Sequence, residues 1–338
     1  MLPVYVELIL LTGAILFIGS LLVRYAESLS EITGIGQIFI GSIVLAGATS
    51  LPELAVDAHA VLKGMPNLAV GDLFGSCLFN LLILAVADLI HKERGAMFGP
   101  AAARHALSGV LSIAMVSIVA MMVLLSKFDR HLTIGGLGSG PIIVGIVYIF
   151  GSRIIYRDAL RSGQIKTSIN LKLNMSHPLW GVLIKYALCT IALLIVAPEL
   201  ARVADQIATN SNLGRTFIGT TLVAGITSMP EMVATIIAVR RGSFGLAAGN
   251  IFGSNAFNMV ILLPLDALFP GDLLGKVDFS HMITCLSVVF ITSIAVSAQL
   301  YQVAQRRRFI DPDAWVVIGL VITALFLLYL THDFAGVF

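Results

Sequence analysis

Long apolar runs alternate with short polar connections along almost the whole chain. Each run has at least about 18 residues, the length that a helix needs to cross the hydrocarbon core of a bilayer. The pattern predicts about ten membrane-spanning helices, at residues 3–23, 36–62, 67–90, 105–126, 136–156, 179–200, 214–239, 245–269, 278–300 and 313–332. We therefore expect an all-α polytopic membrane protein.

The longest polar connection, residues 157–178, divides these runs into two groups of five. Residues 41–80 align with residues 219–258 without a gap, and 18 of the 40 aligned positions are identical. Because five is odd, the second group enters the membrane from the opposite side, which is the inverted-repeat arrangement of many transporters. We expect a first inverted repeat at residues 1–156, a cytoplasmic connecting loop, and a second repeat at residues 179–338.

Composition supports a membrane protein and excludes other classes. The 338 residues are 58% hydrophobic and only 12% charged, whereas a soluble domain has about 25% charged residues. The formal net charge of +2 gives no reason to expect nucleic acid as a partner. Cys77, Cys189 and Cys285 are scattered singly, so neither a disulfide framework nor a zinc site is predicted. We expect no cofactor, and the lipid bilayer as the surrounding partner of a functional monomer.

Basic residues predict the orientation in the membrane. Most of the 21 Lys and Arg residues lie in connections on one side, including the 157–178 loop and the triplet at 306–308. The positive-inside rule places this side in the cytoplasm and both chain termini outside. The first run lacks a preceding basic segment, so we interpret it as an uncleaved span. With no organelle targeting signal or large regulatory loop, a prokaryotic plasma membrane is the expected location.

A carboxylate lies deep in the second apolar run, within the sequence GSIVLAGATSLPEL at residues 41–54. A charge inside a membrane helix is costly and usually marks a functional site. Pro52 lacks an N–H and disturbs the helix, so freed carbonyl oxygens need a partner such as a cation or water. Thr49 and Glu53 are four residues apart and share a helix face, with Ser50 close by. The alternative is a proline-kinked helix with a hydrogen-bonded glutamate.

The seventh run repeats this motif as GTTLVAGITSMPEM, with Thr227, Ser228 and Glu231 in the matching positions. A duplicate is not explained by a simple kink. Hydroxyls, carbonyls and a carboxylate are hard oxygen ligands, which suit Ca²⁺, Na⁺ or Mg²⁺. The two glutamates carry a formal charge of −2, which suits one Ca²⁺, while the same oxygens could hold several monovalent ions in turn. A site that cannot hold both kinds of ion at once gives exchange rather than cotransport.

A second pair of matching motifs follows at residues 71–80, GDLFGSCLFN, and 249–258, GNIFGSNAFN. Each places a hydroxyl and an amide four residues apart on one helix face. These side chains are Ser76 with Asn80 and Ser254 with Asn258. Taken alone, the pattern is equally typical of small-residue helix packing. Beside the glutamates, it predicts the opposite wall of a cation site.

The duplicated motifs G-x4-A-G-x-T-S-x-P-E and G-[DN]-x-F-G-S-x2-F-N resemble the two alpha repeats of the sodium/calcium exchanger family, part of the cation/calcium antiporter superfamily. The resemblance covers both motif pairs, the number of spans and their inverted orientation. It implies a cation site near the membrane midplane, with Glu53 and Glu231 shared between Ca²⁺ and Na⁺. It further implies main-chain ligands at Thr49, Thr227, Ala46 and Ala224, and Na⁺ contacts from Ser50, Ser228, Ser76 and Ser254. Spans one and six would slide as a pair to alternate access.

Three positions depart from the family pattern. Many members have Asp at the position of Asn258, so one possible carboxylate is missing here. In contrast, Asp57 and Asp72 have the neutral partners Thr235 and Asn250 in the second repeat. We expect both aspartates about one turn extracellular of the site. There they would form an acidic outer vestibule that raises the local cation concentration, or partly replace the missing carboxylate. The alternative is pairing with Lys63 or His59 near the membrane surface.

The favoured function is secondary antiport of Ca²⁺ against Na⁺. An exchanger coupled to H⁺ or dependent on K⁺ would use the same glutamates and is the nearest alternative. An intramembrane enzyme is disfavoured because the chain has no HExxH motif and no suitably spaced aspartate pair or Ser/His set. A passive channel is disfavoured because a central carboxylate pair in broken, inverted-repeat helices is typical of alternating access.

Overall fold

A computed structural model of the chain describes residues 2–90, 97, 103, 105–126, 128, 133–134, 137–161, 177–210, 224–301 and 312–334. Most of these residues are helical, and the prediction of an all-α membrane protein is confirmed. In this described part, seven helices are long and apolar enough to span a membrane, and a bent helix pair, Gln37–Thr49 with Leu51–Leu62, makes an eighth. This pair is called the bent helix below. A short hairpin that the sequence did not reveal, β1 (Thr133–Ile134) paired antiparallel with β2 (Leu137–Gly138), precedes the fifth span.

The helices follow the predicted order in both halves. The first half contains α1 (Leu2–Thr33), α2 (Gln37–Phe39), the π-helical turn η1 (Ile40–Leu45), α3 (Ala46–Thr49), α4 (Leu51–Leu62), α5 (Pro66–Ile90), α6 (Ala106–Ser126) and α7 (Ser139–Arg161). The second half contains α8 (His177–Asn210), α10 (Met229–Arg240), α11 (Phe244–Leu268), the short α12 (Leu273–Lys276), α13 (His281–Leu300) and α14 (Pro312–Phe334). The start of the seventh predicted span lies outside the described residues.

Two consecutive helices return in the second half at a constant offset. Helices α10 and α11 begin and end 178 residues after α4 and α5, respectively. The connections also match, because Gly64 and Gly242 both have positive φ angles, 73° and 76°. Only glycine adopts this left-handed conformation at little cost, and it commonly ends a helix. The conformation of residues 51–90 is therefore repeated at residues 229–268.

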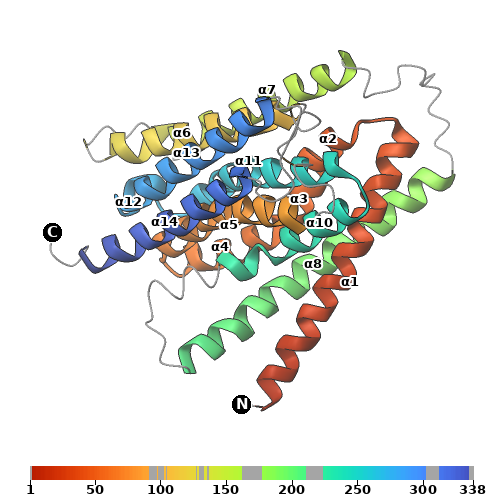
Figure 1. The fold of residues 1–338 in the computed structure, drawn as a ribbon. Coiled ribbons are helices and arrows are strands. Elements are labelled where there is room, and N and C mark those ends of the chain that lie inside the picture. Colours follow the sequence, from red (N-terminus) through yellow and green to blue (C-terminus); the bar gives the residue numbers. More distant parts are fainter. Residues whose placement is uncertain are drawn as a thin grey trace.

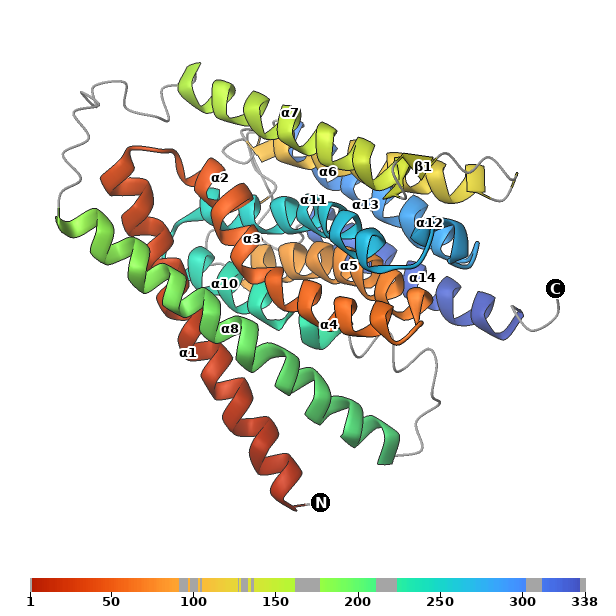
Figure 2. The ribbon, with the colours of Figure 1, turned by 180° about the vertical axis from the view of Figure 1, so that it is seen from behind.

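Helices α1 and α8 lie side by side and run obliquely across one face of the other helices (Figures 1 and 2). They are antiparallel, since Glu7 near the start of α1 pairs with Arg202 near the end of α8 at 2.7 Å. Their outer surfaces are largely open: only 22% and 17% of their most apolar windows are buried. A hydrogen bond of 2.8 Å from the Tyr186 hydroxyl to the Val44 carbonyl ties α8 to the bent helix.

Both of these helices continue beyond the ends of the predicted spans. Helix α1 continues to residue 33 rather than 23, and α8 to residue 210 rather than 200. A hydrophobicity criterion stops at charged residues, but charged residues do not interrupt a helix that leaves the membrane core. In the extension of α1, Glu27 accepts hydrogen bonds from Arg241 and Ser243 at the turn between α10 and α11. The extended end is thus attached to the second half.

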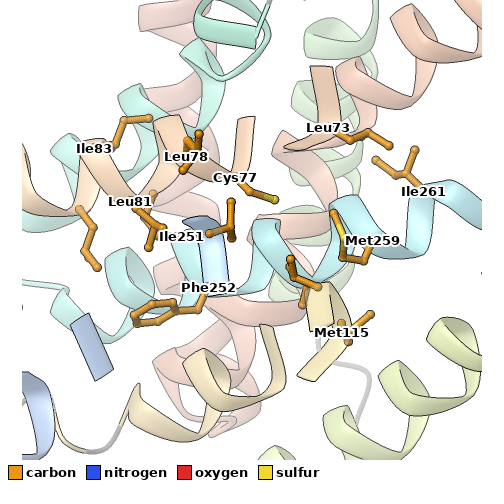
Figure 3. Packing of buried hydrophobic residues seen from close by; sticks show 14 of the residues in the cluster. Leu73, Cys77, Leu78, Leu81, Ile83, Met115, Ile251, Phe252, Met259 and Ile261 are labelled. Atoms are coloured by element: carbon orange, nitrogen blue, oxygen red, sulfur yellow. The ribbon is translucent and has the colours of Figure 1, made fainter. Parts of the chain in front are cut away.

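Helices α5 and α11 occupy the centre, and two thirds of each apolar window is buried. Their buried side chains pack in one apolar cluster with those of α6, as Figure 3 shows for Leu81, Ile251 and Met115. Helix α11 also packs on η1 and α3. A Cβ atom at Gly253 would lie only 2.3 Å from the carbonyl oxygen of Ser42. The backbones of α11 and the bent helix are therefore in direct contact, as small residues allow between membrane helices.

This contact predicts a large effect of one methyl group. Gly253→Ala should lower stability by about 1–3 kcal/mol or more, because the atoms in its way belong to the backbone and cannot rotate aside. Thermal unfolding in detergent measures the change. Gly319→Ala in α14 is the matched control, since a Cβ there would meet nothing within 4 Å. Equal unfolding temperatures for the two variants would contradict the close contact.

Candidate cation site

The bent helix changes direction at the serine of each Thr-Ser-x-Pro-Glu motif. Ser50 (φ −91°, ψ 3°) separates α3 from α4, and Ser228 (φ −76°, ψ 4°) precedes α10 in the same way. In the first half the two segments meet at 40°. Glu53 and Glu231 consequently lie in the first turns of α4 and α10. The positive end of a helix dipole stabilises negative charge there, which explains why a carboxylate is tolerated at the break.

All of the predicted site residues are inside the protein. Each has a relative exposure of at most 1%: Ala46, Thr49, Ser50, Glu53, Asp57, Asp72, Ser76, Asn80, Ala224, Thr227, Ser228, Glu231, Ser254 and Asn258. They come from the bent helix and α5 of the first half, and from α10, the residues before it, and α11 of the second half. The predicted set therefore lies on four segments that the fold packs together.

Glu231 joins the two halves. The Ser50 hydroxyl donates a hydrogen bond of 3.0 Å to its Oε1 atom, and the Ser254 hydroxyl donates to the same atom at 3.5 Å. One donor comes from each half of the chain. The Glu53 carboxylate lies near enough to Glu231 for the two charges to repel each other. The two glutamates predicted from the repeat thus approach one another in space.

The two threonines make mirrored contacts. The Thr49 hydroxyl donates to Oδ1 of Asn250 on α11, and the Thr227 hydroxyl donates to Oδ1 of Asp72 on α5, both at 3.2 Å. Asn250 and Asp72 are equivalent positions of the two repeats. Thr227 also lies 3.4 Å from the Ser76 hydroxyl. Each break is therefore held against the central helix of the opposite half.

Asn255 is a structural residue that the sequence analysis missed. Its amide oxygen accepts a hydrogen bond of 2.9 Å from Asn80, and its amide nitrogen donates to the Cys77 carbonyl at 3.3 Å. The Cys77 thiol in turn contacts the Asn255 carbonyl at 3.8 Å. Residues 77 and 255 are repeat equivalents that contact each other, so they lie where the two halves meet. Because their identities differ, a comparison based on shared residues passed over both.

Several buried oxygens at this place have no hydrogen-bond partner among the described groups. They are Oε2 of Glu53 and Glu231, both carboxylate oxygens of Asp57, Oδ2 of Asp72, Oδ1 of Asn80, Oδ1 of Asn258 and the Ser228 hydroxyl. Buried polar atoms in folded proteins are nearly always satisfied. A hard cation would satisfy several of these oxygens at once. No three His, Cys, Asp or Glu side chains within the described ranges gather closely enough to hold a metal by themselves, so neutral oxygens must contribute.

The carbonyls of Ala46 and Ala224 already have partners. Each accepts one hydrogen bond from the backbone N–H four residues later. A threonine hydroxyl also lies 3.2 Å from each carbonyl, but its single proton is shared with the contact to Asn250 or Asp72. A cation that binds at either carbonyl would take the place of this threonine proton.

Asp57 and Asp72 do not line an exposed vestibule in this structure. Both are fully buried, although the sequence analysis placed them in an outer approach to the site. The alternative pairing with Lys63 or His59 is not observed either, since no ion pair of the described residues involves either aspartate. Glu53 instead lies near enough to both for their charges to interact. They are part of the interior.

A model of the sodium/calcium exchanger protein family matches residues 4–150 and 179–334, both halves of the chain. The chain is 32% identical over 297 residues to inner membrane protein YrbG of Escherichia coli, covering 83% of this chain and 88% of that protein. It is 26% identical over 295 residues to sodium/calcium exchanger MaX1 of Methanosarcina acetivorans, covering 78% and 82%.

Among solved structures, the sodium-calcium exchanger NCX_Mj soaked with Na⁺ in the absence of Ca²⁺ superposes with a TM-score of 0.71. The sequence identity is 21%, and the match covers 96% of this chain and 99% of the other. At this identity the likeness establishes the fold.

The Asn255 contacts generate a prediction about the junction of the halves. Asn255→Ala should lower stability by about 1–3 kcal/mol, because the Asn80 amide and the Cys77 carbonyl lose their buried partner. Thermal unfolding of the purified protein measures this. Cys77→Ala is the matched control: it removes a weak thiol contact and should cost less. A larger loss in the control would show that the asparagine network is unimportant.

Proposed function

Because the chain belongs to the sodium/calcium exchanger family, we propose that it exchanges Ca²⁺ for Na⁺ by alternating access at one buried site. Family membership makes it a multi-pass membrane cation antiporter rather than an enzyme. The proposed part is that the exchanged ions are Ca²⁺ and Na⁺. Both ions are transported cargo, and no cofactor is assigned to the protein.

The observation that carries the proposal is the junction at Glu231. This carboxylate is buried, is held by a hydroxyl from each half, and lies close to Glu53. Two unneutralised carboxylates are costly in a low-dielectric interior, so a positive ion is needed between them. One Ca²⁺ balances the two charges. Several Na⁺ ions can replace it on the same oxygens, which is the basis of exchange.

We assign the ligands as follows. Glu53 and Glu231 supply the charged oxygens for Ca²⁺, and the neighbouring threonine carbonyls complete its shell. Na⁺ takes the same carboxylates together with serine hydroxyls and asparagine amide oxygens. The neutral ligands are Thr49, Thr227, Ser50, Ser228, Ser76, Ser254, Asn80 and Asn258, with the Ala46 and Ala224 carbonyls after their donors move away. The unpartnered Glu53 oxygen in the first half and the unpartnered Ser228 hydroxyl in the second half support this assignment.

Alternating access requires two arrangements of helices around one site. We propose that residues 1–156 and 179–338 form inverted repeats, as the constant offset of α10 and α11 from α4 and α5 supports. Helices α1 and α8 then move as a pair against the remaining helices. They are joined to each other by the Glu7–Arg202 ion pair, and they contact α10 and α4, respectively, beside the breaks.

The oligomeric state, membrane and orientation are also part of the proposal. A single chain supplies both halves of the site, which supports a functional monomer. A prokaryotic plasma membrane, with both termini outside, is the proposed location. It is supported by similarity to a bacterial protein named for the inner membrane and by the distribution of basic residues.

Coupling to H⁺ or K⁺ is the second candidate. Many family members have Asp at the position of Asn258, and the amide carries no charge. The site therefore needs fewer positive charges to balance it, which changes the number or kind of coupled ions. Ca²⁺ uptake into proteoliposomes under Na⁺, K⁺ and H⁺ gradients, imposed one at a time, separates the candidates. We expect uptake driven by the Na⁺ gradient; uptake driven only by K⁺ or H⁺ would replace Na⁺ as the coupling ion.

The site predicts the effect of neutralising either glutamate. Glu53→Gln and Glu231→Gln should each reduce Ca²⁺ uptake by at least about 100-fold, because loss of a buried charged ligand costs about 3–5 kcal/mol. Asp278→Asn changes an exposed carboxylate by the same chemistry and should leave uptake unchanged. Full uptake in either glutamine variant, with normal folding, would reject the site.

A further inference from the structure

Asp57 and Asp72 are two carboxylates that the proposed exchange cycle does not use. Asp57 lies on α4, one turn beyond Glu53, and Asp72 lies on α5. Both are at least 99% buried. Their side chains approach closely enough to hydrogen-bond if a proton were present between them. The two aspartates therefore face each other inside the protein.

The second half shows what the same place looks like without charge. The equivalents of Asp57 and Asp72 are Thr235 and Asn250. The Asn250 amide nitrogen donates a hydrogen bond of 3.2 Å to the Thr235 hydroxyl. This pair is neutral and mutually satisfied. The fold thus accepts a plain hydrogen bond at this position, and the aspartates are not required for packing.

The aspartates lack what their equivalents have. Neither oxygen of Asp57 has a hydrogen-bond partner, nor has Oδ2 of Asp72. Only Oδ1 of Asp72 is satisfied, by the Thr227 hydroxyl. The ion pairs of the described residues engage Glu7, Glu27 and Glu199 instead. Within the described part of the chain, three buried carboxylate oxygens of this facing pair have neither a hydrogen-bond partner nor an ion-pair partner, an arrangement that favours a bound cation.

We propose that Asp57 and Asp72 form a second cation site, which binds an alkali cation next to the Glu53–Glu231 site. The ion contacts both oxygens of Asp57 and Oδ2 of Asp72. The Thr227 hydroxyl, by donating to the remaining oxygen, connects this site to the break of the second half. Since Thr227 is also assigned to the central site, the two sites share a structural element.

The ligand set favours a singly charged ion. Ca²⁺ would match the formal charge of two carboxylates, but it takes about six to eight oxygen ligands; alkali ions also need more oxygens than this pair offers, so charge rather than coordination number separates the ions. The pair leaves three oxygens free. A second divalent ion would also repel the Ca²⁺ of the central site, since the Coulomb energy scales with the product of the charges. An alkali cation halves that repulsion and still lowers the negative charge.

This inference rests on the proposed exchange function only for its biological use. In an exchanger, an alkali ion bound here accompanies the cargo of the central site or stays bound while that cargo is exchanged. In either case the number of alkali ions bound per chain exceeds the number held by Glu53 and Glu231. Binding can be measured without any transport.

The decisive variant copies the second half into the first. In Asp57→Thr with Asp72→Asn, the pair becomes the hydrogen-bonded Thr/Asn pair that the fold already contains. Equilibrium binding of ²²Na⁺ and of ⁸⁶Rb⁺, as a substitute for K⁺, is measured on purified protein with and without saturating Ca²⁺. We expect the parent chain to bind one more alkali ion than the double variant, while both proteins bind the same number of ⁴⁵Ca²⁺ ions per chain. The isotope that shows the difference identifies Na⁺ or K⁺ as the ion.

Equal alkali-ion binding by both proteins would overturn the inference, as would loss of ⁴⁵Ca²⁺ rather than alkali-ion binding. Asp57→Asn is a nearly isosteric second test, which should weaken the extra alkali ion by more than about tenfold. Size-exclusion profiles and unfolding temperatures verify folding of both variants. A failure of the proposed exchange function gives a different result. In that case Glu53→Gln would leave Ca²⁺ uptake intact, whereas the parent chain would still bind the extra alkali ion.

Discussion

Four carboxylates buried in a membrane protein are the constraint on which the rest of the structure depends. Glu53, Glu231, Asp57 and Asp72 have no basic partner among the described residues. Water is absent from a hydrocarbon core, so the protein itself must provide stabilising groups. The chain places two of these charges at helix starts and surrounds them with hydroxyls and amides. In the proposed function, exchangeable ions provide the remaining stabilisation. A site that the protein satisfied completely would have no reason to bind cargo.

The duplicated motifs build this arrangement from two equivalent halves, and the positions where the halves differ are informative. The two breaks contact the opposite central helices through equivalent threonines, so neither half can form its site alone. Symmetry then fails in two ways. Ser50 donates a hydrogen bond to Glu231, whereas the equivalent Ser228 hydroxyl has no partner and does not donate to Glu53. A charged pair in one half also corresponds to a neutral, hydrogen-bonded pair at the equivalent positions of the other half. Equivalent backbones thus carry unequal electrostatics, which allows the two sides of one site to serve different ions.

Much of this could be predicted from the sequence, because apolar run length and duplication are strong signals. The helix order, the proline-associated breaks and the convergence of Glu53 with Glu231 all followed from residues that the halves share. The role of Asn255 did not, because it contacts its own equivalent, Cys77, and such a pair has no reason to be identical. Burial of Asp57 and Asp72 was also missed. The position of a residue along its helix does not reveal which neighbouring helices cover its side chain. This covering depends on how the helices pack against each other, which the sequence alone does not specify. The charged ends of α1 and α8 were excluded from the predicted spans for a different reason, because a hydrophobicity criterion stops at charged residues.

The exposed surfaces of α1 and α8 have a further consequence. Most of their apolar windows face outward rather than toward other helices. In the proposed sliding motion of α1 and α8, this surface displaces acyl chains instead of interlocked side chains. Friction against lipid would then contribute to the barrier between the two proposed access states. The order and thickness of the surrounding bilayer would set how fast the transporter turns over, even though no lipid approaches the ions.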